Sequence, residues 1–353
     1  MKIDIFNHIF PQRFFDRLQE GASLARDMPR RVRQVPLLVD LEARFRVMDA
    51  FGDYRQVLSL ASPPLEVLAD PDESPELARL ANDGLAELVD RYPDRFVGFV
   101  AALPLNHPEA AVAEMHRAVR ELGARGVQLF TNVLGRPLDE PDFAPLFEGM
   151  AGFDLPIWLH PARGAYVPDY LCEYKSKYEI WWAFGWPYET SVAMAHLVFS
   201  GLFDRFPGLK VITHHMGGMV PYFEGRVGHG WDQLGKRTSD EDYRLVLHSL
   251  KRRPLDYFRL FYADTALFGS RSGTRCGLDF FGVDHVLFAS DAPFCPEPGL
   301  YIRETIRAIE DLDLTAWKRE QIYHGNAERL LNLSPAPGAH QVREGDGRSL
   351  GGE

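Results

Sequence analysis

Cysteine is scarce in this chain of 353 residues, which contains three: Cys172, Cys276 and Cys295. They are an odd number, lie far apart and form no C-x-x-C pair. Neither a disulfide framework nor a structural zinc knuckle is therefore expected. This usage favours a reducing compartment, and we expect a cytoplasmic protein.

Long apolar runs and an excess of positive charge are also missing. No uncharged apolar run reaches the roughly 18 residues of a membrane helix, and Asp4 lies where a signal peptide would be apolar. The formal net charge of −11 argues against nucleic acid or an anionic membrane as a partner. With 46% hydrophobic and 25% charged residues, the composition is that of a soluble globular protein.

What the chain does contain is a series of short apolar runs separated by amphipathic segments. Such runs are typical of strands buried on both faces of a parallel sheet. Their alternation with helices predicts a (β/α)₈ TIM barrel, with a doubly wound open sheet as the alternative. The predicted strands are 2–6, 56–60, 96–101, 126–130, 156–160, 210–214, 260–263 and 285–290, and the clearest helices are 75–91, 108–122 and 191–206.

We expect one domain over residues 1–333 and a disordered tail over 334–353, where Pro, Gly and charged residues replace large apolar ones. Two long segments, 13–40 and 161–187, follow the first and fifth strands. Loops in these positions build the active face of a barrel, so both are candidate substrate walls. The second is rich in Tyr, Trp and Phe, which either contact a substrate or pack the loop or a subunit interface.

Polar residues interrupt the apolar pattern where several predicted strands end, which is where a barrel carries its active site. Any one of them alone is readily explained as a structural, hydrogen-bonded residue. Together, imidazoles and a carboxylate that converge on one point predict a divalent-metal site with open positions for water or substrate. A further His could transfer protons near neutral pH. These residues are His8, His160, His214, His215, Asp264 and Asp291.

Several motifs resemble one family. They are GWPYET at 185–190, SGLFDRFP at 200–207, HMGGMVPY at 215–222, SDAPF at 290–294 and GNAERLL at 325–331. The sequence resembles, from residue 3 to about 333, the amidohydrolase-related metal-dependent barrels of the aminocarboxymuconate-semialdehyde decarboxylase and γ-resorcylate decarboxylase type. The resemblance implies a TIM barrel of the metal-dependent hydrolase type and, by the same likeness, a homodimer.

The resemblance also implies roles for individual residues. His8, His160 and Asp291 match the metal ligands, with Zn²⁺ expected first and Mn²⁺ or Fe²⁺ as alternatives. His215, which directly precedes MGG, matches the catalytic histidine and acts with Asp291, and His214 is then expected to point into the barrel wall. One ligand position falls on Phe6, which cannot bind a metal. The metal is therefore either held by three ligands or lost.

The implied reaction is non-oxidative decarboxylation of a small aromatic or unsaturated carboxylic acid. Hydrolysis of a small cyclic, amide or ester substrate on the same site is the alternative, either by a metal-activated water or, if the metal is lost, by the histidines and Asp291 alone. A non-catalytic binding protein with a degenerate site is the second alternative.

Four residues are candidates for substrate binding. Arg163 and Arg226 could pair with a substrate carboxylate, although a structural ion pair explains either arginine as well. Trp182 and Trp186 could hold a flat, unsaturated acid.

Overall fold

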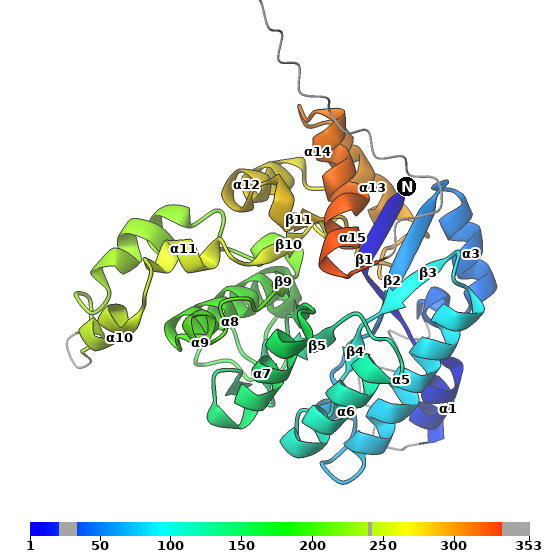
Figure 1. Ribbon diagram of the computed structural model, residues 1–353, viewed down its shortest axis with the longest axis horizontal. Coiled ribbons are helices and arrows are strands. Elements are labelled where there is room, and N and C mark those ends of the chain that lie inside the picture. The colour runs from blue at the N-terminus through cyan, green and yellow to red at the C-terminus, as the bar shows by residue number, and fades with distance from the viewer. Residues whose placement is uncertain (21–33, 239–241, 334–353) are drawn as a thin grey trace, which may run out of the picture.

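The computed structural model describes residues 1–20, 34–238 and 242–333, in which strands and helices alternate along the chain (Figure 1). The strands are β1 (Lys2–Ile9), β2 (Tyr54–Leu60), β3 (Phe96–Phe99), β4 (Ala101–Ala102), β5 (Val127–Phe130), β6 (Asn132–Val133), β7 (Arg136–Pro137), β8 (Ile157–His160), β9 (Val211–Thr213), β10 (Tyr262–Asp264) and β11 (Val286–Leu287).

The α-helices lie outside these strands (Figure 1). They are α1 (Gln12–Glu20), α3 (Leu41–Asp49), α4 (Leu65–Leu68), α5 (Ser74–Arg91), α6 (Pro108–Arg120), α7 (Ala144–Phe153), α8 (Trp186–Phe199), α9 (Leu202–Arg205), α10 (Arg244–Ser249), α11 (Pro254–Phe258), α12 (Arg271–Phe281), α13 (Leu300–Glu310), α14 (Ala316–Glu320) and α15 (Asn326–Leu330). Shorter 3₁₀ or π turns occupy Pro36–Leu38, Pro141–Phe143, Trp181–Gly185, His215–Gly217, Arg226–Gly230, Trp231–Gln233, Val283–His285 and Gln321–Gly325.

Each of the eight predicted strands is present, the third as β3 and β4 on either side of Val100. The ladders are parallel and run in the orders β1-β2-β3 and β11-β10-β9-β8-β5-β4. The small hairpin β6–β7 is an antiparallel addition. Consecutive parallel strands with helices between them are the pattern expected for a βα barrel.

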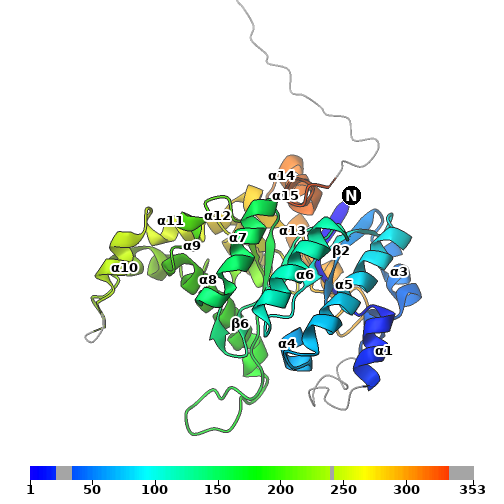
Figure 2. The same cartoon turned by 60° about the horizontal axis from the view of Figure 1, so that its bottom comes forward.

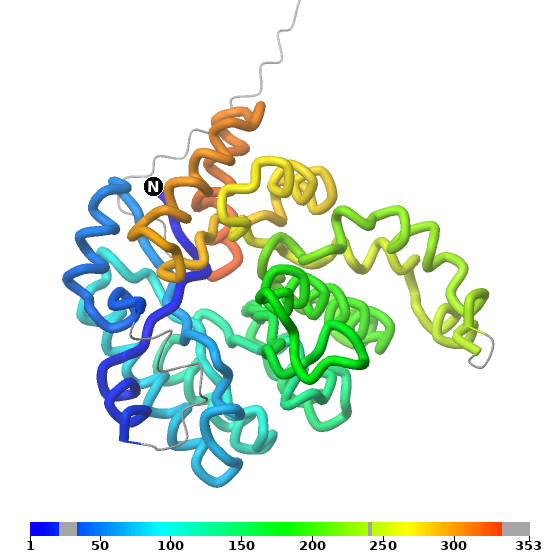
Figure 3. The backbone as a smooth tube through the Cα atoms, turned by 180° about the vertical axis from the view of Figure 1, so that it is seen from behind, coloured from blue at the N-terminus to red at the C-terminus, as the bar shows by residue number. Residues whose placement is uncertain are grey.

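Backbone hydrogen bonds join the two ladders at both ends. Val100 donates its N–H to the Leu58 carbonyl, which connects β2 to the chain between β3 and β4. Ile5 donates to Phe288, and Asp291 donates to Phe6, so β1 is bonded to the segment that follows β11. Figure 3 shows this first strand, in blue, beside the orange segment. The bonding favours the barrel over the open sheet.

The layer beneath the helices is apolar, and the barrel interior holds both apolar and polar side chains. Strands β5 and β8 are buried at every position, which explains why their sequences do not alternate between apolar and polar residues. Trp158 fills part of the interior, and its indole N–H donates to the Ile5 carbonyl at 3.0 Å. The core therefore fixes the strand ends on which the polar residues lie.

The predicted boundaries hold for some elements and change for others. The predicted helix 191–206 is two helices, α8 and α9, because Gly201 has a left-handed φ of 73° between them. In the long segment after the first strand, residues 12–20 form α1, and residues 21–33 lie outside the described ones. The segment between β8 and α8 forms a long loop that projects from the barrel (green in Figure 2). The predicted disordered tail, 334–353, also lies outside the described residues.

No helix within the described residues is long and apolar enough to cross a membrane.

Candidate metal and active site

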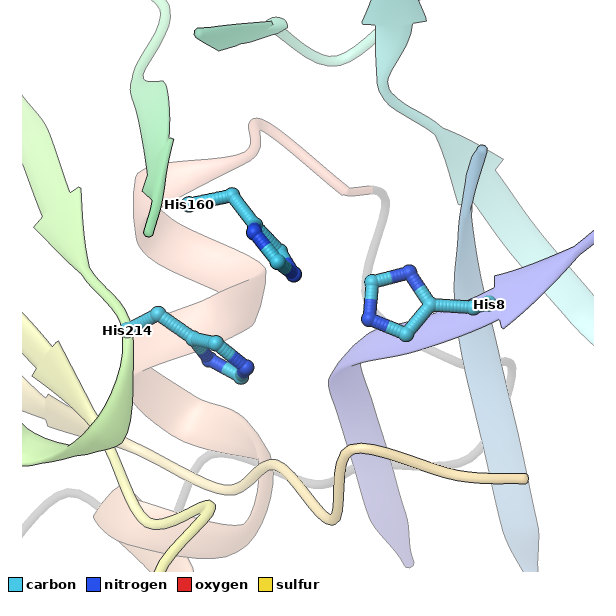
Figure 4. A group of neighbouring side chains, drawn as sticks. All are labelled: His8, His160 and His214. Atoms are coloured by element: carbon cyan, nitrogen blue, oxygen red, sulfur yellow. The ribbon is translucent and has the colours of Figure 1, made fainter. Parts of the chain in front are cut away.

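The polar residues at the strand ends meet at one place inside the barrel. His8 lies in β1, His160 ends β8, and His214 follows β9. Figure 4 shows these three rings turned toward one another, and one nitrogen of each lies within 4.8 Å of the others. All three side chains are buried, at 2% exposure or less. A buried cluster of imidazoles needs a partner for its lone pairs or protons.

Asp291 is the carboxylate at the centre of this cluster. Its Oδ1 lies 3.1 Å from His8 Nε2 and 3.6 Å from His214 Nε2. Its Oδ2 lies 3.7 Å from His215 Nε2. Burial alone would raise the pKa of Asp291, but its interactions with the histidines hold that pKa well below the usual range. Asp291 is therefore ionised and available as an oxygen ligand.

His8 and His160 are each held through Nδ1, so that Nε2 faces the cluster. His160 Nδ1 donates to the Pro161 carbonyl at 2.7 Å. His8 Nδ1 is hydrogen-bonded to Ser59 Oγ at 3.1 Å, and His8 Nε2 is hydrogen-bonded to Asp291 Oδ1 at 3.1 Å. Burial lowers the pKa of both imidazoles, and the His214 charge lowers that of His160 further. Both rings are thus neutral, and a metal at the cluster would bind them through Nε2.

The expectation that His214 points into the barrel wall is wrong. Its Nδ1 is hydrogen-bonded to Asp264 Oδ2, and its Nε2 faces Asp291. Asp264 ends β10 and also accepts the His215 N–H at 3.0 Å, so it fixes the chain and the ring together. Burial would lower the pKa of His214, but the Asp264 and Asp291 carboxylates raise it to about 9. A cation at the cluster would take the place of the Nε2 proton.

The residues present fit a divalent metal. Two groups of side chains have ligand atoms close enough to share an ion: His8, His160 and His214, and His214, His215 and Asp291. Among the described residues, His214 Nε2 and His215 Nδ1 are buried and have no hydrogen-bond partner. Imidazole and carboxylate donors suit zinc, manganese or iron. The structure brings His8, His160 and Asp291 together, and their ligand role stays a prediction.

Aromatic rings line the approach to the cluster. Trp186 is packed edge-on against His160, with ring centroids 5.4 Å apart, and Phe268 lies 5.6 Å from His215. Phe294 and Phe130 lie 5.5 Å from His8 and 5.0 Å from His160. Sequence reasoning singled out Trp186 but gave the three phenylalanines no role, although Phe130 ends a predicted strand and Phe294 closes the SDAPF motif.

Three residues at the site have a left-handed backbone, which is unusual outside glycine. The φ angles are 51° at His215, 54° at Phe268 and 59° at Asp291. Such conformations cost of order 1–3 kcal/mol each and concentrate where function fixes a side chain. Here they turn the side chains that follow β9, β10 and β11 toward a common centre.

The other predicted substrate residues are placed differently. Arg163 forms an ion pair with Glu189 at 2.8 Å, so its guanidinium already has a carboxylate partner. Arg226 is exposed and lies over the Phe223 ring, 5.9 Å from its centroid. Trp182 contacts Phe268, with centroids 5.7 Å apart. Trp182 therefore extends the aromatic wall, whereas both arginines have a structural contact, and all three substrate roles stay predictions.

Comparison with known proteins now identifies the family. The model of the amidohydrolase family designated Amidohydro_2 matches residues 3–333. The chain belongs to this family. It is 35% identical over 315 residues to a γ-resorcylate decarboxylase of Polaromonas sp., covering 84% of this chain and 89% of the relative. It is 30% identical to the 2-amino-3-carboxymuconate-6-semialdehyde decarboxylase of Dictyostelium discoideum, covering 79% of this chain and 73% of the relative.

A solved structure agrees with this assignment. The 5-carboxyvanillate decarboxylase of Novosphingobium aromaticivorans, complexed with manganese and 4-hydroxy-3-methoxy-5-nitrobenzoic acid, aligns with a TM-score of 0.79 at 28% identity. The alignment covers 94% of this chain and 96% of that structure. The comparisons confirm the predicted family and the TIM-barrel fold. They also agree with the predicted reaction class, because these relatives are decarboxylases. Manganese, rather than the zinc expected first, is the metal in that relative.

Proposed function

We propose that this member of the family is a metal-dependent, non-oxidative decarboxylase of a small, hydroxyl-bearing aromatic carboxylic acid. The observation that carries the proposal is the buried cluster of His8, His160, His214 and Asp291 at the strand ends of the barrel. The relatives named above support the reaction class. The site lies among aromatic rings, which favours a flat substrate.

The metal would be held at least by His8, His160 and Asp291. A divalent ion held there would supply a positive charge that stabilises developing negative charge on the substrate. We favour Mn²⁺ because of the relative that contains it, with Zn²⁺ and Fe²⁺ as the alternatives that the same donors accept.

The aromatic side chains would position the substrate ring. Trp186 and Phe268 flank His215, with centroids 6.2 and 5.6 Å from its ring. A flat acid between them would place the carbon that bears the carboxylate close to this histidine. The rings also exclude water, which strengthens electrostatic interactions in the site.

His215 is the proposed proton donor, with Asp291 as its partner. Its Nε2 lies 3.7 Å from Asp291 Oδ2, and Asp291 is ionised. The proton passes from His215 to the ring carbon that carries the carboxylate. The carbon–carbon bond then breaks, its electron pair returns to the ring, and carbon dioxide leaves. A proton taken up from the solvent restores His215, so each turnover consumes one proton and releases one carbon dioxide.

Three broader expectations belong to the same proposal. We propose one domain over residues 1–333, in keeping with the family match over 3–333. We propose a homodimer, and exposed aromatic residues on the segment after β8 support an interface; Tyr166, Tyr170, Tyr174, Tyr178 and Phe184 are the residues concerned. A cytoplasmic location is consistent with the free cysteines of the described residues.

Release of carbon dioxide tests the function. The Mn²⁺-loaded protein is incubated with 2,6-dihydroxybenzoate, 5-carboxyvanillate and benzoate, and the gas and the decarboxylated ring are quantified together. We expect equimolar products from a hydroxyl-bearing acid, none from benzoate and none after chelation. Metal-loaded protein that releases no carbon dioxide from a panel of hydroxybenzoic and muconate-like acids would overturn the proposal. Cleavage of esters or lactones by that same protein would point to hydrolysis.

A further inference from the structure

Phe6 lies directly against the histidine cluster and contributes only carbon to it. Its side chain is fully buried, and its ring stacks on His214 with centroids 3.8 Å apart. It also contacts His8 and His160, with centroids 5.2 and 5.6 Å away. Phe6 therefore packs an apolar ring against the three imidazoles. It occupies the position where a metal ligand is expected from the family resemblance.

His214 presents a nitrogen to the same space. Its Nδ1 is bonded to Asp264 Oδ2, which leaves Nε2 as the atom that faces the cluster. That Nε2 is buried and has no hydrogen-bond partner among the described residues. It lies 3.6 Å from Asp291 Oδ1, within the group that contains His8 and His160. A carboxylate behind a metal-binding imidazole is a common arrangement because it fixes ring orientation and makes the ligand more basic.

We propose that His214 is a metal ligand of this chain and replaces the ligand that Phe6 does not provide. The site is then made of three imidazoles and one carboxylate: His8, His160, His214 and Asp291. The inference rests on the proposed metal-dependent function and deepens it. Stacking of His214 on Phe6 links the two positions physically, since the phenyl ring supports the face of the imidazole that replaces the lost ligand.

His215 is the competing ligand, and the geometry favours a different role for it. Its Nε2 faces Oδ2 of Asp291, whereas His8 and His214 face Oδ1. Its ring lies beside Trp186 and Phe268, where a substrate would be held. The two adjacent histidines thus have different roles: His214 binds the metal and His215 faces the substrate.

Metal affinity of two matched variants tests the inference. His214→Asn can keep a hydrogen bond to Asp264 through its amide but has no atom at the position of Nε2. His215→Asn is the matched control at the adjacent position. Mn²⁺ affinity is measured by competition with a chelating indicator, on protein whose folding is checked by thermal unfolding. We expect His214→Asn to weaken binding by at least about 100-fold, more than the loss of an outer partner, and His215→Asn by less than about threefold.

A measurement on the wild-type protein tests the same inference even if a variant fails to fold. X-ray absorption of the Co²⁺-loaded protein counts its imidazole ligands, and we expect three. Two imidazoles, or unchanged Mn²⁺ affinity in His214→Asn, would overturn the His214 assignment and leave the proposed function standing. Loss of affinity in His215→Asn instead would assign the ligand to that residue. A wild-type chain that binds no divalent metal would overturn the inference and the metal-dependent function together.

Discussion

Replacing Asp264 with asparagine should weaken metal binding through the ring of His214, without touching any ligand atom. Asp264 Oδ1 accepts two backbone N–H groups, from His215 and Ala266, both at 3.0 Å. In Asp264→Asn, the amide oxygen is expected to keep those two bonds, which turns the NH₂ group toward His214 Nδ1. Two donors cannot face each other, so Nδ1 must give up its proton and become the acceptor, which leaves the one proton of the ring on Nε2.

The magnitude follows from the position of that proton. A proton on Nε2 blocks the atom that faces Asp291, and a metal can bind only after the ring returns to the less favourable tautomer. Loss of an outer partner of a metal ligand typically costs 10–100-fold in affinity, or about 1.4–2.7 kcal/mol. We expect a loss in this range for Mn²⁺, measured by competition with a chelating indicator. Asp256→Asn, an exposed aspartate in α11, is the matched control. Unchanged affinity in a folded Asp264→Asn protein would refute the tautomer argument.

Three further predictions concern stability and substrate binding. Burial raises the pKa of Glu66 from 4.5 to about 7, so wild-type stability should fall as pH rises from about 4.5 to 7. Chemical unfolding should then show Glu66→Gln gaining about 3 kcal/mol on wild type between pH 4 and pH 8; a pH-independent difference would contradict this. Trp186→Ala should raise KM for an aromatic acid about two- to tenfold, from a ring contact worth about 0.5–1.5 kcal/mol, and steady-state kinetics with an unchanged KM would remove Trp186 from the substrate site. Chelation should lower the midpoint of thermal unfolding, since an ion at 100 times its Kd stabilises by about 2.7 kcal/mol; an identical midpoint for loaded and chelated protein would count against a structural role of the ion.

The strands and the convergence of polar residues could be predicted from the sequence because both are local patterns. Apolar runs fully buried in a parallel sheet have a simple signature, and the carboxyl ends of such strands face the same side. His8, His160 and Asp291 follow or end these runs, so their meeting in space required no further information.

The orientation of His214 could not be predicted in the same way. Two histidines stand side by side, and only one was expected to face the site because adjacent residues of a strand point to opposite faces. The left-handed φ of 51° at His215 breaks this alternation. The partner of His214 is Asp264, fifty positions away on the neighbouring strand. Arg163 shows the same limit, because its ion pair with Glu189 depends on how the long segment after β8 folds back.

The metal content of the purified protein tests the central claim most directly. Elemental analysis of unchelated protein, repeated on a His160→Ala variant, reports on the cluster without requiring a substrate. We expect close to one divalent ion per chain in the wild type and a large loss in the variant, because His160 Nε2 is a proposed ligand. Wild-type protein that takes up no divalent metal under any loading condition, or a variant that retains full metal content, would contradict the account.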